Sequence, residues 1–180
     1  MKLSVLGFTL IELLIVVAII AIISAAGYTY QGSFRESQKL KIAVNTIQSL
    51  LGQTQSNATA RRDCNSETGA TWMVTFELSQ ISVNIKCQGS GSPVTQKNYT
   101  LEPNIVVAGW FFDITCNHFF PAGPAFSIKF SPLYGTVSFE DTTYTCISSK
   151  DFIKIQLKNT KTTETKDITI NKGGYISVEQ

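Results

Sequence analysis

The first part of the chain is an apolar run interrupted by a single acid. Residues 7–26 read GFTLIELLIVVAIIAIISAA, and Glu12 is the only charged residue among them. A helix that crosses a lipid bilayer needs about 20 apolar residues, and this run supplies nearly that number. Because an acid near such a span costs about 3 kcal/mol on insertion scales, the pattern predicts an apolar helix in which Glu12 serves a purpose other than anchoring.

The next segment is polar, with apolar residues returning at helical spacing. Leu40, Val44, Ile47 and Leu51 recur every three or four positions, which predicts one face of an amphipathic helix. The helix is therefore expected to continue beyond the apolar run. Its apolar stripe packs either against the chain's own domain, which is the commoner use, or against neighbouring subunits.

From about residue 70 the pattern changes to short alternating segments separated by turn residues. The predicted strands are residues 71–78, 81–87, 100–108, 125–130, 135–139, 144–147, 152–157, 168–170 and 175–178. Many short strands without an intervening helix favour an antiparallel sheet or a small sandwich. The predicted fold class is α+β, a long N-terminal helix packed on a β-rich head domain.

Charge and cysteine usage narrow the function classes. The net charge is +2, with lysines and acids scattered along the chain, so the total does not indicate a nucleic-acid or acidic ligand. Four cysteines, none in a CxxC pair, disfavour zinc and thioredoxin-like chemistry. The cysteines are Cys64, Cys87, Cys116 and Cys146. All four follow the apolar segment, which would place them in an oxidising space outside the cytoplasm, so two disulfides are favoured over buried free thiols. Three pairings remain open.

The sequence offers no catalytic constellation. The single histidine, His118, stands beside Cys116 and two phenylalanines, and is interpreted as a loop or packing residue because no third group orients it. Glu140 and Asp141 are expected in a turn. Without a phosphate loop, HExxH or GxSxG, the chain is predicted to be no enzyme and to use no cofactor.

The stretch Gly7, Phe8, Thr9, Leu10, Ile11, Glu12 and the apolar run after it resemble the type IV prepilin signature. The resemblance implies that a membrane peptidase cuts after Gly7 and methylates the new N-terminus at Phe8. It also implies that Glu12 of one subunit pairs with the Phe8 amine of its neighbour and so sets the axial register. The alternative for Glu12 is an acid tolerated at a helix N-terminus, where the helix dipole favours it.

The same resemblance implies a domain plan and a set of partners. Residues 1–7 would be the leader, 8–26 the transmembrane and filament-core helix, 27–63 its amphipathic continuation, and 64–180 an extracytoplasmic β-rich domain. The implied partners are other pilin subunits, the prepilin peptidase, the inner-membrane assembly platform and, before assembly, membrane lipid. The implied location is the cytoplasmic membrane, followed by a surface or periplasmic filament.

The C-terminal stretch ITINKGGYISV is similar to the last strands of GspH/FimT-like minor pilins and pseudopilins. Some members bind DNA through an arginine-bearing motif at this turn, but the matching positions here carry no arginine. A polyanion site would instead have to use Lys154, Lys158 and Lys172, whose default interpretation is a solvated strand face.

A different class of protein, a secreted binding domain released by cleavage after Ala26, is the main alternative.

Overall fold

The computed structural model describes residues 9–77, 81–113, 116–119, 125–141 and 151–179, without the side chains of residues 25–31, 111–119 and 141. The chain divides into two compact units, residues 1–36 and 37–180. One helix, α1 (Leu10–Thr59), contributes to both. Each unit is described below by itself.

The C-terminal end of α1 is closed by its own backbone. Arg62 N–H donates to the Asn57 carbonyl at 2.9 Å and Arg61 N–H to the Ala58 carbonyl at 3.1 Å, while Arg61 has a φ of 50°. This is the hydrogen-bond pattern of a Schellman motif, with arginine in the left-handed position that glycine usually takes. The helix therefore ends before residue 63, the end expected from sequence.

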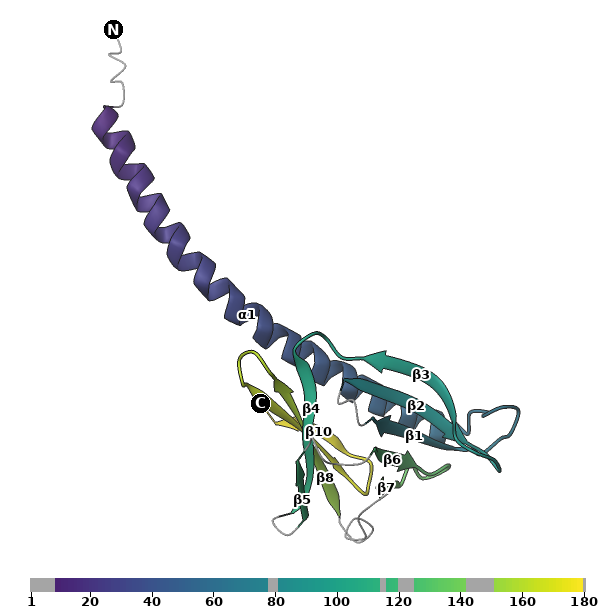
Figure 1. Ribbon diagram of the computed structural model, residues 1–180. Coiled ribbons are helices and arrows are strands. Elements are labelled where there is room, and N and C mark those ends of the chain that lie inside the picture. The colour runs from purple at the N-terminus through teal and green to yellow at the C-terminus, as the bar shows by residue number, and fades with distance from the viewer. Residues whose placement is uncertain (1–8, 78–80, 114–115, 120–124, 142–150, 180) are drawn as a thin grey trace. The chain divides into compact units, whose positions relative to one another are not determined.

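Among the described residues, ten strands form two antiparallel five-stranded sheets, shown in Figure 1. The first has the order β3-β2-β1-β6-β7, with β1 (Thr71–Phe76), β2 (Ser82–Gln88), β3 (Val94–Thr100), β6 (Phe126–Phe130) and β7 (Val137–Asp141). The second has the order β10-β9-β8-β4-β5, with β4 (Ile105–Asp113), β5 (Cys116–Phe119), β8 (Phe152–Asn159), β9 (Thr165–Asn171) and β10 (Ile176–Glu179). The predicted α+β class with an antiparallel head is confirmed.

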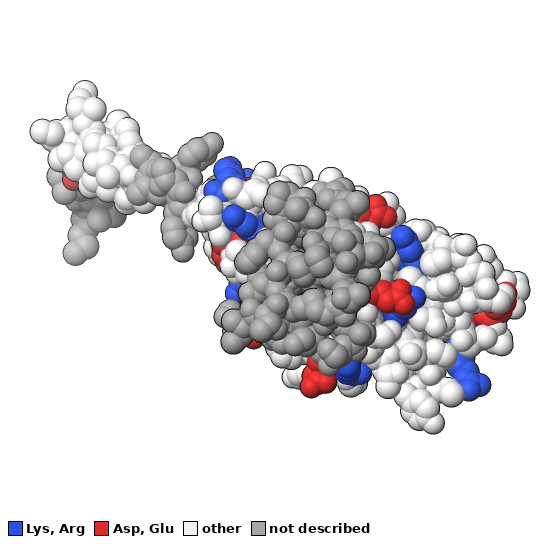
Figure 2. Space-filling view, turned by 60° about the horizontal axis from the view of Figure 1, so that its bottom comes forward, with Lys and Arg blue, Asp and Glu red and all other residues white. Residues whose placement is uncertain are grey.

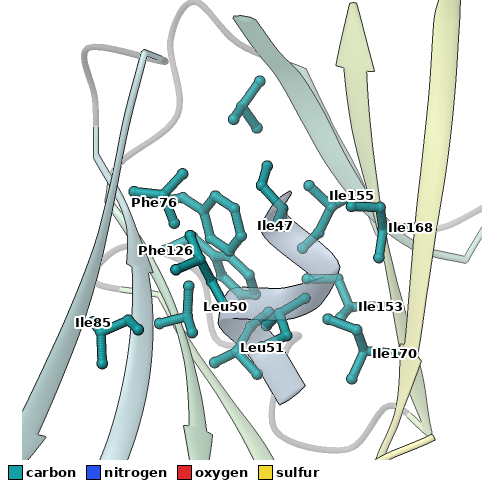
Figure 3. Close-up of a cluster of buried hydrophobic side chains, with 14 of the residues drawn as sticks. Ile47, Leu50, Leu51, Phe76, Ile85, Phe126, Ile153, Ile155, Ile168 and Ile170 are labelled. Atoms are coloured by element: carbon teal, nitrogen blue, oxygen red, sulfur yellow. The ribbon is translucent and has the colours of Figure 1, made fainter. Parts of the chain in front are cut away.

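The C-terminal part of α1 lies between the two sheets and joins their cores. In Figure 3, Ile47, Leu50 and Leu51 stand between Phe76, Ile85 and Phe126 of the first sheet and four isoleucines of the second, Ile153, Ile155, Ile168 and Ile170. All ten side chains are buried. The predicted stripe of α1 therefore packs into its own domain, since Leu40, Val44, Ile47 and Leu51 are at most 2% exposed.

Two turns that contain glycine, at Gly135 and Gly174, lie against the C-terminal part of α1. Gly174 and Gly135 have φ angles of +82° and +60°, which favour glycine. Gln55 of α1 donates from Nε2 to the Gly174 carbonyl at 3.1 Å, and Val137 N–H donates to the Lys172 carbonyl at 3.0 Å. The glycine turn between β9 and β10 thus contacts both the helix and the first sheet.

Several strand predictions need correction. The strand expected at residues 100–108 crosses a turn, because Asn104 has a φ of 71° and β4 begins only at Ile105. Strands β3 and β5 were not expected. Glu140 lies within β7 rather than in a turn, as does the backbone of Asp141. The strand expected at residues 144–147 lies outside the described residues.

Candidate functional site

The N-terminal end of α1 is closed by a reciprocal pair of side chains. Thr9 donates to Glu12 Oε2 from both its backbone N–H and its hydroxyl, each at 3.2 Å. In return, Glu12 N–H donates to Thr9 Oγ1 at 3.3 Å. This is a capping box, in which threonine at the N-cap and glutamate three residues later satisfy two of the unpaired N–H groups of the first turn. It explains why the helix begins at Leu10.

The two carboxylate oxygens of Glu12 are in different situations. Oε2 accepts both hydrogen bonds from Thr9, whereas Oε1 accepts none from the residues that the structure describes. Glu12 is exposed in the single chain. The carboxylate therefore completes its own helix with one oxygen and leaves the other open to a cation. The sequence reasoning missed Thr9, although the T-x-x-E spacing before an apolar run is the signal that identifies it.

The predicted cleavage position precedes this cap. Gly7 and Phe8 lie outside the described residues, and the first described residue is Thr9. Phe8 is four positions before Glu12 in the sequence. Cleavage and methylation at these positions stay a prediction.

The first turns of α1 expose an apolar surface. Every large aliphatic side chain from Leu10 to Ile23 is between 46% and 77% exposed. Soluble monomers rarely expose a contiguous apolar surface of this kind, so it marks a site of contact with protein or lipid. Within the described ranges, no helix combines the length and the apolar character that a membrane crossing requires.

One of the two predicted disulfides is present among the described residues. Cys64, which follows α1, is joined to Cys87 of β2, with an S–S length of 2.03 Å and a Cα–Cα distance of 5.8 Å. Cys146 lies outside the described residues, and the side chain of Cys116 is not described. The two-bridge prediction now has one remaining pairing to test, Cys116 with Cys146.

The same loop carries the clearest electrostatic feature of the head domain. Glu67 accepts hydrogen bonds from the hydroxyl and the backbone N–H of Ser90, at 2.6 and 2.5 Å. The hydroxyl, followed by the N–H, holds the pKa of this exposed carboxyl below its ordinary value, because both hydrogen bonds favour the ionised form. Together with Cys64–Cys87, this contact fastens the loop after α1 to the loop between β2 and β3.

The lysines considered as polyanion contacts lie in the second sheet and the turn after it. Lys154 and Lys158 of β8 alternate with the buried Ile153, Ile155 and Leu157. Lys154 Nζ lies 2.8 Å from Glu179 and 3.9 Å from Asp167, so carboxylates compensate its charge. Lys172 follows β9. On the face in Figure 2, positive and negative side chains are interspersed on the described surface.

The single histidine lies in a strand rather than in a loop. His118 belongs to β5, where its backbone pairs with Trp110 of β4. Trp110 itself is buried and stacks on Phe126, with ring centroids 5.2 Å apart. Trp110 therefore belongs to the core of the head domain.

Comparison with known proteins bears on the N-terminal end of the chain. Residues 4–28 match the family model of the prokaryotic N-terminal methylation motif. This range contains Gly7, Phe8, the Thr9–Glu12 capping box and the exposed apolar surface. The chain thus carries a prepilin-type N-terminal methylation motif.

Two further comparisons concern the whole chain. No curated protein matches it in sequence. Among solved structures, the chain is similar to the minor pseudopilin EpsH from the type 2 secretion system of Vibrio cholerae, with a TM-score of 0.46 and 11% identity over 78% of this chain and 96% of that chain.

Proposed function

We propose that the chain is a pilin-like subunit of a type IV pilus or a related type II secretion filament. The observation that carries the proposal is the methylation motif at residues 4–28. The exposed apolar surface and Glu12, which would contact neighbouring subunits, both lie at the start of α1. The protein acts by assembling with other subunits, not by catalysis.

In the proposed pathway the precursor first resides in the cytoplasmic membrane. The apolar run at residues 8–26 is close to the length of about 20 residues that spans a bilayer. The prepilin peptidase cuts after Gly7 and methylates Phe8, and the assembly platform then transfers the subunit into the filament. There the exposed aliphatic side chains of α1 exchange lipid for the same side chains of neighbouring subunits.

Glu12 guides this transfer through its open oxygen. Cleavage creates a positive amine at Phe8, and in an apolar surrounding an ion pair is strongly favoured over two separate charges. The amine of one subunit would bind Oε1 of Glu12 in the next, while Oε2 continues to cap its own helix. Staggered subunits would then have one preferred axial register.

A secreted domain released after Ala26 is the alternative from another class. Helix α1 runs without a break through Ala26 and Gly27, so such a cut would fall inside the helix. DNA is not part of the proposal, because carboxylates already neutralise Lys154, one of the three candidate lysines.

Mass spectrometry of the N-terminal peptide from purified filaments tests the proposal. The expected peptide begins with N-methylated Phe8. A start at Gly27 would support secretion instead, and filaments that retain residues 1–7 would overturn processing at Gly7. A Gly7→Val variant, which blocks close approach at the scissile bond, should accumulate uncut in the membrane fraction.

A further inference from the structure

The outer face of the first sheet carries two neighbouring rows of side chains. Along β1, Trp72, Val74 and Phe76 belong to the core, so Met73 and Thr75 point to the opposite face. The strand registers place Asn84, Thr75, Ser127 and Glu140 in one row, and Lys86, Met73 and Lys129 in the next.

This face is more enclosed than the outer face of an antiparallel sheet usually is. Met73, Thr75 and Asn84 are 3%, 5% and 3% exposed, whereas outer faces are normally solvated. A hollow of about 320 Å³ opens among these strands, with Met73, Thr75, Lys86, Ser127, Lys129 and Glu140 in its lining. Its size falls at the lower end of the range for small-molecule sites, about 300–1,000 Å³.

The polar groups of the hollow have hydrogen-bonding capacity to spare. The hydroxyls of Thr75 and Ser127 lie 2.9 Å apart. Because each hydroxyl carries one hydrogen, one donates to the other and the second keeps its hydrogen for another acceptor. Asn84, the neighbour of Thr75 in the strand register, does not line the hollow, and its Nδ2 donates to the Glu77 carboxylate.

The charges of the hollow do not cancel. Lys129 Nζ lies 2.6 Å from Glu140 Oε1, so this ammonium already has a counter-ion. Lys86 makes no ion pair or side-chain hydrogen bond with any residue that the structure describes. The described residues of the lining therefore carry one surplus positive charge, next to two hydroxyls and an exposed carboxylate.

We propose that this hollow binds a small hydroxylated monoanion with the chemistry of a sugar acid. The carboxylate of the ligand pairs with Lys86, and its hydroxyls bind the Thr75–Ser127 pair and the carboxylate of Glu140. Met73 provides an apolar floor for the C–H face of the ring. A nucleic-acid backbone would need several cations to bind, and Glu140 would repel a second negative charge on a ligand.

Saturation-transfer NMR on the full-length chain in detergent micelles tests the proposal, with sodium glucuronate as the probe. Glucose supplies the hydroxyls without the charge, acetate the charge without the hydroxyls, and inorganic phosphate a second charge. Glucuronate is expected to bind at least about ten-fold more tightly than each of the three, since charged hydrogen bonds and neutral ones both contribute. No binding of glucuronate, or equal binding of acetate or phosphate, would overturn the proposal.

Substitutions locate the binding to the hollow. Lys86→Met removes the ammonium but keeps the aliphatic stem, and should weaken glucuronate binding about ten-fold or more. Thr75→Val, which keeps the shape, should weaken it less. Lys97→Met on β3 makes the same charge change outside the hollow and should leave binding unchanged.

Unchanged binding in Lys86→Met, with a urea midpoint equal to that of the wild type, would place the ligand elsewhere. Lys86→Gln replaces Lys86→Met if the latter does not fold. N-terminal processing and filament incorporation are expected to be normal in these variants, so failure of this proposal would leave the proposed assembly function standing.

Discussion

Glu12 combines two roles that single substitutions can separate. Its Oε2 caps α1 with Thr9, and its charge is proposed to bind the amine of a neighbour. Glutamine can replace glutamate in a capping box, so Glu12→Gln keeps the cap and loses the charge. Thr9→Ala does the reverse, and costs the helix about 1 kcal/mol.

We expect Glu12→Gln and Glu12→Ala to insert into the membrane as well as the wild type or better, and to be strongly depleted from filaments. Thr9→Ala should be depleted from filaments to a smaller extent. Immunoblots of membrane fractions and of sheared filaments measure both quantities. Filaments of Glu12→Gln at the wild-type level would show that the acid acts only as a cap, and would remove the register argument.

Glu67 should make the stability of the head domain depend on pH. Its pKa is lowered in the folded state, chiefly by the Ser90 hydroxyl and then by the Ser90 N–H. The stabilisation is therefore present above the ordinary pKa of an unfolded glutamate and is lost as the pH falls through the folded value. Glu67→Gln should be less stable than the wild type at pH 6, and the difference should shrink at pH 3.

Urea unfolding followed by fluorescence of Trp72 and Trp110 measures this difference, since both side chains are buried. Glu102→Gln is the matched control, because the Glu102 side chain makes no hydrogen bond or ion pair with the described residues. If Glu67→Gln lowered the free energy of unfolding equally at both pH values, the Glu67 carboxylate would not stabilise the fold through its charge.

At the scale of elements, the turn between β9 and β10 depends on a particular glycine. Gly174 has a φ of +82°, and a Cβ built there would collide with the Gln55 amide and stand 3.1 Å from the Gly135 carbonyl. Gly174→Ala should therefore lower the free energy of unfolding by about 1–3 kcal/mol. Gly91→Ala, where no atom lies within 4 Å of the added Cβ, should change it by less than about 0.5 kcal/mol.

Denaturant unfolding of the two variants in parallel checks this expectation. Because the lower flexibility of alanine in the unfolded chain would by itself stabilise the fold, a loss in Gly91→Ala as large as that in Gly174→Ala would show that the positive φ and the close contacts of Gly174 are not its cause. Because the Gly174 carbonyl also accepts from Gln55, Gln55→Ala should reproduce part of the loss.

Periodicity explains which elements the sequence could predict. The stripe from Leu40 to Leu51 was predicted correctly because burial on one side of a helix imposes its spacing. Strand β3, VTQKNYT, was missed because it is an edge strand with mostly exposed side chains, which removes the alternation. The turn at Pro103 and Asn104 was present as a signal but was overridden by the apolar residues on either side.

The candidate site also has some features that the sequence could predict and others that it could not. The Gly7–Glu12 pattern indicated the methylation motif because its information is local in sequence. The pairing of Cys64 with Cys87 was one of three open choices, since only the tertiary fold brings the end of α1 beside β2. The hollow on the outer face of the first sheet could not be predicted, because it depends on the order β2-β1-β6-β7.

For the whole molecule, the position of α1 between the sheets decides which part of the chain can fold alone. Residues 37–180 form one compact unit, and in it Ser37 donates to Glu164 at 2.6 Å. Ile47 and Leu51 are fully buried. Removing one such side chain typically costs about 2–5 kcal/mol, whereas an entire domain is stable by only about 5–15 kcal/mol.

A chain that begins at Ser37 should therefore fold cooperatively in water, and one that begins at Arg62 should not, because the two sheets would face each other across the missing helix. Within the chain from Ser37, Leu51→Ala should lose about 2–5 kcal/mol, whereas Ile42→Ala, at a position 52% exposed, should lose less than about 1 kcal/mol. Circular dichroism and urea titration measure both comparisons. A cooperative transition at the same midpoint without residues 37–61 would show that the sheets close on each other, and that α1 serves only assembly.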